Sequence, residues 1–181
     1  MDIFFYDGSS IKKASTLEEA GSHPVWVDST NISKDEESLL RDHFKLHPLS
    51  AEDLYNNNIR IKVEEFPTYL LCVFYGLKKH KQMDLYEVDY VLGANFLITN
   101  HKHPVDSISE LKNDLDRIKR SFEKGLDFLF HRIVDVEVDG FFPALESVDS
   151  EIEAIEEIVT TRIEKNTMSK KNSTPIPISM F

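Results

Sequence analysis

Short apolar stretches and longer helical periods divide the chain into elements. Stretches rich in β-branched and aromatic residues predict strands at 3–8 and 25–30, and again at 62–79, 85–93 and 95–101. The last three stretches follow one another closely, with glycine and proline between them. We therefore expect them to pair as the body of a largely antiparallel sheet.

Helix start signals lie near the first strands. Thr16 and Glu19 have the spacing of a capping box, in which a hydroxyl and a carboxylate satisfy free N–H groups at a helix end. Ser33 and Glu36 repeat this spacing ahead of an apolar period, so they predict a helix over 34–45.

Two long helical patterns follow the strands. After Pro104, apolar residues recur at steps of three and four and predict one helix as far as Phe122. Residues 126–164 carry a heptad-like apolar seam. Gly140 and Pro143 lie within that segment, which is therefore either one bent rod or two helices. The seam consists of Phe141, Leu145, Val148, Ile152, Ile155 and Val159.

Strands enclosed by helices define the expected architecture. We predict an α+β fold, a three-layer α/β/α sandwich around a mixed, largely antiparallel sheet, followed by long acidic helices. Residues 1–124 form the α/β domain, and 125–164 form an acidic helical segment that packs on it and projects. The polar residues 165–181 include two prolines and are expected to form a flexible tail.

The charge of the chain narrows the possible functions. The formal net charge is -11, so the phosphate backbone of a nucleic acid would be repelled and no nucleic-acid partner is expected. The densest basic run, KKHKQ at 78–82, fits a solvated hairpin end. Eleven acids and two arginines lie within 126–164, which leaves that segment at -9. This segment is either a solvated acidic face or a surface that repels its own copies unless cations lie between them.

Cysteine content and hydropathy favour a soluble protein in a reducing compartment. Cys72 is the single cysteine, so no intrachain disulfide is possible. The N-terminus has no secretory signal, and no run of about 18 apolar residues occurs that could cross a bilayer as a helix.

One acidic pair is a candidate for metal binding. Pro48 favours the start of a helix, and Ala51 and Leu54 then give it an apolar face from which Glu52 and Asp53 are turned away. The partial positive charge of the helix N-terminus can account for both acids. A hard cation is the alternative, because Mg²⁺ keeps most of its water and is commonly held by one or two carboxylates.

Other candidate chemistry is weaker. His101 and His103 share a face of a strand and could bind a transition metal, but no further ligands lie near them in the sequence. Chance histidines at a strand end are the better interpretation. The sequence has no nucleophile elbow, P-loop or dinucleotide-binding glycine motif, so we do not expect an enzyme.

A family resemblance connects these observations. The stretch FKLHPLSAEDLYNNNIRIKVEEFPTYLLCVF at 44–74 resembles the hallmark of the cytosolic half of CorA-type magnesium transporters. VWVD lies upstream, and YVLGANFLITNH and the acidic FLFHRIVDVEVDGFFPALESVDSEIEAIEE lie downstream in the same order as in that family. The resemblance covers residues 23–164.

The resemblance implies a homopentameric channel for Mg²⁺, with Co²⁺ as a further candidate ion, whose cytosolic domains sense Mg²⁺ and close the pore. By matched position Asp53 is the expected regulatory ligand and Glu52 its companion, with the cation between neighbouring subunits. Asp135 and Asp139 on the acidic helix are weaker candidates for a second ion. The three asparagines after the helix would end it or supply neutral oxygen ligands.

The chain departs from the family pattern in its C-terminal part. The stalk helix, both membrane helices and the Gly-Met-Asn pore signature are missing, so the resemblance implies a soluble cytosolic fragment. Its parent would lie at the cytoplasmic side of the inner membrane and contact the membrane only through the missing helices. The fragment is expected to be monomeric or dimeric. The alternatives are the cytosolic domain of a zinc-transporting relative and a free-standing helical interaction module.

Overall fold

The computed structural model describes residues 1–56, 60–78 and 84–171, with side chains described as far as residue 163. It divides into two compact units, Met1–Phe141 and Phe142–Phe181. The asparagines at 57–58 and most of the basic run lie outside the described residues.

The strands are β1 Asp2–Tyr6, β2 Ile11–Ala14, β3 Val25–Thr30, β4 Lys62–Phe66, β5 Tyr69–Lys78, β6 Asp84–Gly93 and β7 Phe96–His101. The helices are α1 Leu17–Ala20, α2 Lys34–Phe44, α3 Pro48–Tyr55, α4 Asp106–Lys112, α5 Leu115–Phe122, α6 Leu126–Asp139 and α7 Phe142–Lys171.

The strands of the first unit form one mixed sheet, in the order β2-β1-β3-β7-β6-β5-β4. The pairing of β3 with β7 is parallel, and the other pairings described are antiparallel. The long antiparallel β5–β6–β7 body confirms the expected arrangement of the last strands. Strand β2 was not predicted, because its sequence IKKA has no alternation strong enough to identify it.

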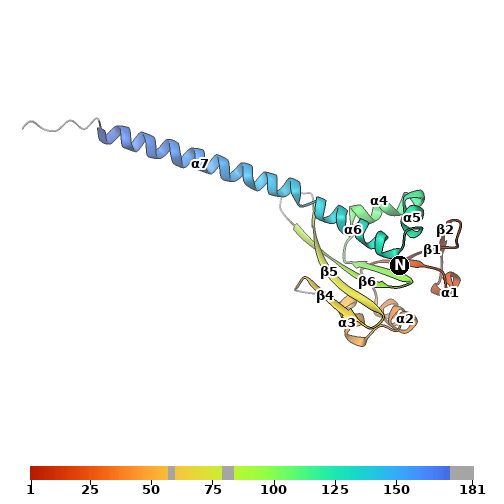
Figure 1. Ribbon diagram of the computed structural model, residues 1–181. Helices are drawn as coiled ribbons and strands as arrows, with labels where there is room; N and C mark the ends of the chain where they lie inside the picture. The colour runs from red at the N-terminus through yellow and green to blue at the C-terminus, as the bar shows by residue number, and fades with distance from the viewer. Residues whose placement is uncertain (57–59, 79–83, 172–181) are drawn as a thin grey trace, which may run out of the picture. The chain divides into compact units, whose positions relative to one another are not determined.

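Helices cover both faces of the sheet (Figure 1). One core cluster joins α2 and α3 to the sheet through residues such as Leu40, Leu54 and Val27. A second joins α4, α5 and α6 to the opposite face, with Trp26 and Leu129 among its buried members. The predicted three-layer α/β/α sandwich with a mixed sheet is therefore confirmed.

Polar side chains join β3, β7 and α4 in the interior. Asp28 on β3 is buried and accepts hydrogen bonds from the Thr99 hydroxyl at 2.5 Å and from Lys112 Nζ at 2.6 Å. His101 Nε2 lies 3.2 Å from the same carboxylate. Burial alone would raise the pKa of Asp28, but the bonds from His101, Lys112 and Thr99 outweigh it and lower the pKa.

The segment from Pro104 to Phe122 is broken rather than continuous. Helix α4 ends at Lys112, and Asp114 begins α5 by accepting the N–H of Arg117 at 2.9 Å. Aspartate is a favoured N-cap residue, because its carboxylate accepts a backbone N–H at a helix start. Capping by Asp114 therefore starts a new helix within an apolar period that would fit one continuous helix. Leu115, one of the apolar residues in that period, is 52% exposed.

The helical segment after residue 125 is split into two helices, one of the two arrangements left open above. Helix α6 ends at Asp139, with Gly140 as its C-cap, and α7 begins at Phe142. The expected boundary after residue 124 lies directly ahead of α6, whose Leu126, Leu129 and Ile133 are buried. In the second unit, α7 continues to Lys171, past the residue where we expected the tail to start.

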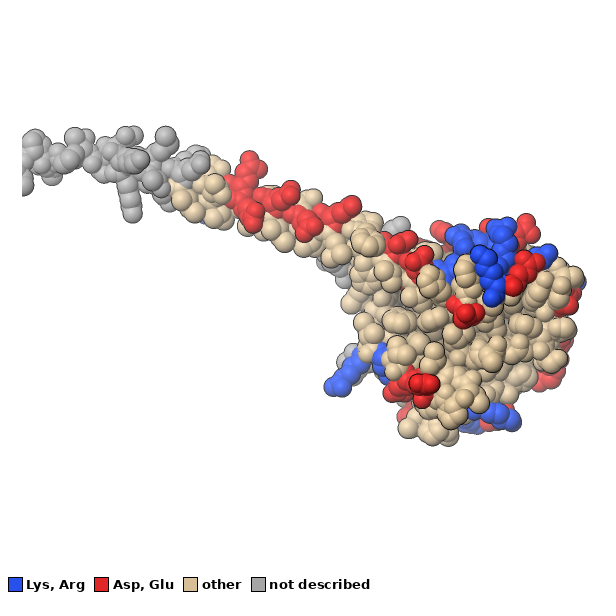
Figure 2. Space-filling model, in the orientation of Figure 1, with Lys and Arg blue, Asp and Glu red and all other residues tan. Residues whose placement is uncertain are grey.

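Helix α7 exposes both its apolar seam and its acids. Leu145, Ile155 and Val159 are at least half exposed, and Figure 2 shows Asp and Glu side chains along the helix. Within the described residues, no helix is both long and apolar enough to span a membrane.

Two predicted helix N-caps, Ser33 and Thr16, allow a test of how much a capping bond contributes to the stability of the fold. The Ser33 hydroxyl accepts the Glu36 N–H at 3.2 Å, and the Glu36 carboxylate accepts the Ser33 N–H at 2.8 Å, which confirms the predicted capping box. Thr16 makes no such side-chain bond at the start of α1. We expect Ser33→Ala to lower the free energy of unfolding by about 0.5–2 kcal/mol. Urea denaturation should show a much smaller loss for Thr16→Ala, and equal losses would contradict this account.

Candidate metal site

Helix α3 positions the predicted acidic pair. His47 caps its start by accepting the Leu49 N–H at 3.3 Å on the imidazole, and Pro48 occupies the first helical position as predicted. Ala51 and Leu54 are buried, so Glu52 lies exposed on the other side of the helix.

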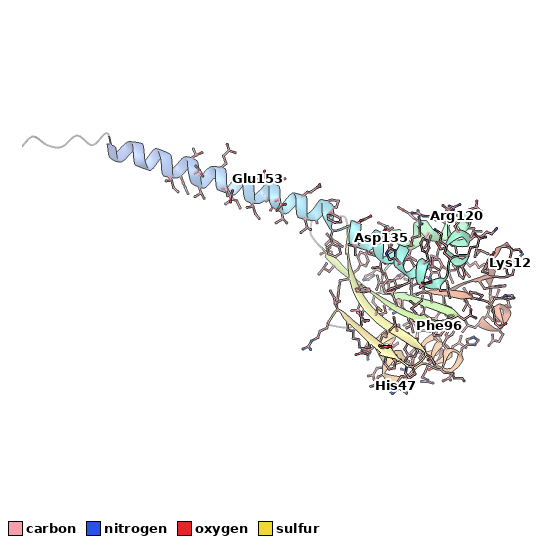
Figure 3. All side chains as sticks on the ribbon, in the orientation of Figure 1. Lys12, His47, Phe96, Arg120, Asp135 and Glu153 are labelled. Carbon is pink, nitrogen blue, oxygen red and sulfur yellow. The ribbon has the colours of Figure 1, made fainter. Side chains whose placement is uncertain are left out.

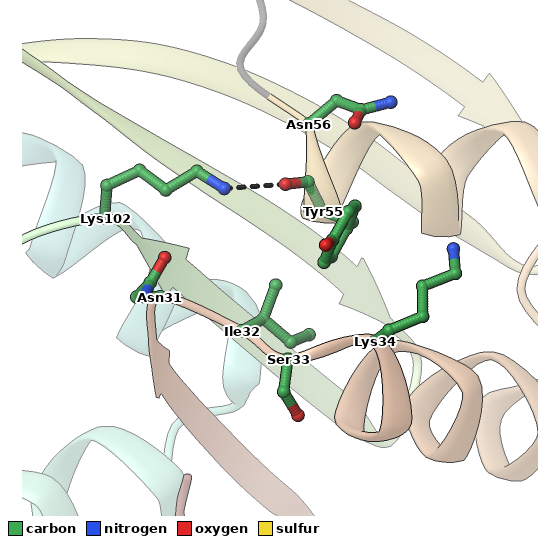
Figure 4. Close-up of a pocket in the computed structure, with 7 residues that line it drawn as sticks. All are labelled: Asn31, Ile32, Ser33, Lys34, Tyr55, Asn56 and Lys102. Atoms are coloured by element: carbon green, nitrogen blue, oxygen red, sulfur yellow. Dashed lines mark hydrogen bonds between the residues drawn. The ribbon is translucent and has the colours of Figure 1, made fainter.

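The end of α3 is fixed to the sheet. Asn100 on β7 donates from Nδ2 to the Leu54 carbonyl at 2.7 Å, and Lys102 donates from Nζ to the Tyr55 carbonyl at 2.6 Å (Figure 4). Both bonds satisfy carbonyls that have no partner inside the helix, and the lysine also suits the negative helix end. The carboxylates on α3 are therefore carried by a helix of fixed orientation.

Asp53 already lies beside a positive charge. Lys62 Nζ on β4 lies 2.6 Å from Asp53 Oδ2 and 3.5 Å from Glu64 Oε1. Burial lowers the pKa of Lys62, but its hydrogen bond to Asp53 and the charges of both acids raise it more. Glu52 instead accepts a 3.4 Å hydrogen bond from the Asn56 side chain. The surroundings of Asp53 thus suit a cation.

Asp135 and Asp139 lie apart from this pair. Both are exposed on α6, which packs on the face of the sheet opposite to α3 (Figure 3). Asp139 lines a cavity of about 380 Å³ with Asp106 and Glu110, whereas Asp135 does not. The structure of one chain therefore does not bring the four predicted ligands together. Among the described residues, no three His, Cys, Asp or Glu side chains form a cluster that could hold a metal ion.

Glu137 is a buried acid that the sequence analysis counted only as part of the acidic segment. It accepts hydrogen bonds from the Tyr86 and Ser107 hydroxyls. Burial of the Tyr86 hydroxyl, together with its hydrogen bond to Glu137 and the charge of that acid, raises the pKa of Tyr86. Glu137 follows Leu129 and Ile133 at steps of four, so its position on the buried face of α6 was readable from the helical period.

Another pocket does not suit a cation. It has a volume of about 550 Å³ and lies beside the ends of β3, β7 and α3 (Figure 4). Its polar lining comes from lysine, serine, tyrosine and asparagine, without any carboxylate. His101 and His103 do not form a metal site either, because His101 Nδ1 donates to the His103 carbonyl at 2.7 Å and Nε2 faces Asp28.

A buried acid lies close to the end of α3. Asp89 on β6 is 2% exposed and accepts the Asn100 side-chain N–H at 3.0 Å. Burial, together with the charge of Glu87, raises its pKa to about 8, although the bond from Asn100 acts in the opposite direction. Asp89 therefore stays protonated in the folded chain at a pH where it ionises in the unfolded chain.

The pKa of Asp89 predicts a pH dependence of stability. Between about pH 4 and pH 8 the unfolded chain releases this proton and the folded chain keeps it, so stability falls as pH rises, by up to about 1.4 kcal/mol per pH unit. We expect Asp89→Asn to flatten this slope, because asparagine cannot ionise and its carbonyl still accepts the Asn100 bond. Urea denaturation across this range would measure it. The exposed Asp116→Asn control should keep the slope, and a slope unchanged in Asp89→Asn would refute the assignment.

The fold of the chain matches that of soluble and cytoplasmic domains solved for other proteins. The structure resembles the cytoplasmic domain of ZntB from Vibrio parahaemolyticus, with a TM-score of 0.69, 14% identity, and coverage of 85% of this chain and 64% of that one. It also resembles the soluble domain of CorA from Methanocaldococcus jannaschii, with a TM-score of 0.62, 19% identity, and coverage of 88% and 64%.

Sequence comparison identifies the family. The chain belongs to the CorA-like Mg²⁺ transporter family, which matches residues 21–171. It is 31% identical over 132 residues to YfjQ of Bacillus subtilis, covering 73% of this chain and 41% of that protein. It is 30% identical over 155 residues to the cobalt/magnesium transport protein CorA of Thermotoga maritima, covering 82% and 44%. The chain thus spans less than half the length of these relatives. The members of this family are transporters and not enzymes, as the sequence analysis expected.

Proposed function

We propose that the chain is the cytoplasmic, Mg²⁺-sensing part of a divalent-cation transporter at the inner membrane. Family membership and the likeness of the fold to transporter soluble domains support this proposal. In it, residues 1–124 form the sensing part and 125–164 the acidic helical part, and the partners are copies of the same chain in a homopentamer.

The observation that carries the proposal is the position of Asp53. Its carboxylate lies on a helix of fixed orientation and beside a positive charge 2.6 Å away. Mg²⁺ needs only one or two carboxylates and retains water, so Asp53 with Glu52 nearby is a sufficient contribution from one chain. The remaining ligands would come from a neighbouring subunit. This agrees with the finding that no three-ligand cluster occurs within the described part of one chain.

In this proposal, charge repulsion between neighbouring subunits, and its relief by a bound divalent ion, regulates the transporter. Acidic surfaces of neighbouring subunits repel one another until a divalent ion lies between them. Bound Mg²⁺ then favours the closed assembly, and its loss allows the subunits to separate, because the ion has different affinities for the two states. Both candidate ligands on this chain are carboxylates, whose oxygens suit a hard cation such as Mg²⁺. Co²⁺ is a further candidate, since the Thermotoga maritima relative is described as a cobalt/magnesium transport protein.

Removal of the Asp53 charge tests the proposed site. A ligand at 100 times its Kd stabilises the folded state by about 2.7 kcal/mol, so millimolar Mg²⁺ should raise the melting temperature of the wild-type chain. We expect Asp53→Asn to lose most of this rise, because the amide has no charge to attract the ion. Asp116→Asn, which removes one exposed charge from α5, should keep it. Equal responses of both variants would contradict the assignment of Asp53.

Asp135 and Asp139 are proposed as ligands of a second, weaker ion on α6. Asp139 already shares a cavity with Asp106 and Glu110, so it is the stronger of the two candidates. We expect Asp139→Asn to lower the remaining Mg²⁺ response of the Asp53→Asn variant, because the sites lie on opposite faces of the sheet and act independently. Mg²⁺ titrations followed by thermal melts would show this, and an unchanged residual response would exclude Asp139.

A further inference from the structure

We propose that Lys62 is a tethered competitor of the divalent cation, so that this lysine sets the Mg²⁺ concentration at which the Asp53 site fills. This inference rests on the proposed function, because it concerns the same carboxylate. The ammonium group acts as a cation already in place, and Mg²⁺ must displace it before Asp53 can become a ligand.

The contact geometry supports displacement. Lys62 Nζ lies 2.6 Å from Asp53 Oδ2, a distance typical of a short charge-assisted hydrogen bond. Both side chains are about one quarter exposed, so water and a hydrated ion can reach them. An ammonium and a divalent ion on one carboxylate repel each other. Occupation by either cation therefore opposes occupation by the other.

The backbone around Lys62 leaves its side chain free to move. Lys62 is the first residue of β4, the last strand at one side of the sheet. Among the residues that the structure describes, β4 pairs only with β5. Its neighbours Val63 and Glu64 are exposed. The four-carbon stem of a lysine has several rotatable bonds, so the ammonium can leave Asp53 without a change in the strand.

Glu64 provides a second position for the displaced charge. Its Oε1 lies 3.5 Å from Lys62 Nζ, on the same strand and 47% exposed. When Mg²⁺ takes Asp53, the ammonium can turn fully towards Glu64 and keep a partner. The two acids therefore define two positions of one lysine, one without Mg²⁺ and one with it.

Lys62→Met tests the competition, because it removes the charge and keeps a side chain of similar length. We expect about 10-fold tighter Mg²⁺ binding by isothermal titration of the full chain, since no internal cation has to leave. Lys119→Met is the charge-matched control. It breaks an exposed contact with Glu123 on α5 and should leave the affinity unchanged. In the Asp53→Asn background, Lys62→Met should have no effect.

Glu64→Gln tests the second position. It should weaken Mg²⁺ binding in the wild-type chain, because the displaced ammonium loses its charged partner, and should have no effect together with Lys62→Met. A weakening that persists in the double variant would instead make Glu64 a direct ligand and overturn this part of the inference.

The outcomes separate the inference from the proposed function. If Asp53→Asn keeps the Mg²⁺ response, the proposed function fails. If Asp53→Asn loses it while Lys62→Met and Lys119→Met bind alike, only the role of Lys62 fails. Should Lys62→Met not fold, nitrogen NMR of the Lys62 ammonium in the wild-type chain decides. Its resonance should move as Mg²⁺ saturates the site, and a fixed resonance would overturn the inference.

Discussion

The parallel pairing of β3 with β7 holds the two halves of this fold together. It joins the hairpin-like N-terminal strands to the antiparallel body, and it is stabilised by a buried carboxylate that accepts bonds from both a strand and a helix. Such a group is costly to bury without partners, so Asp28 stabilises the structure only while Thr99 and Lys112 remain in place. Asn100 of β7 and Lys102, directly after this strand, then anchor α3. The position of the candidate metal site is therefore a consequence of this pairing.

Local signals predicted most of the elements, because the interactions behind them lie within a few residues. The capping box at Ser33 and the proline start of α3 are of this kind. The break at Asp114 was missed because a strong apolar period concealed a capping side chain. Strand β2 was missed because its pairing with β1, and not its own pattern, makes it a strand.

The candidate site was only partly readable from the sequence. The outward direction of Glu52 followed from the helical period of α3. The contact between Asp53 and Lys62 did not, because it depends on how β4 returns past α3 in three dimensions. The separation of Asp53 from Asp139 likewise depends on which face of the sheet each helix covers. The order of several matched segments along the chain indicated the family more specifically than the acidic pair alone.

Within the described part of the chain, strand β4 has a partner on one side only, and open strand sides readily recruit further strands from other molecules. Ile61 and Val63 are 63% and 60% exposed there, while Lys62, Glu64 and Glu65 interrupt the apolar surface with charge. The ionic residues of this strand thus also protect the chain from aggregation. A variant that lost this lysine would therefore also lose one of the charges that interrupt the apolar surface of the strand.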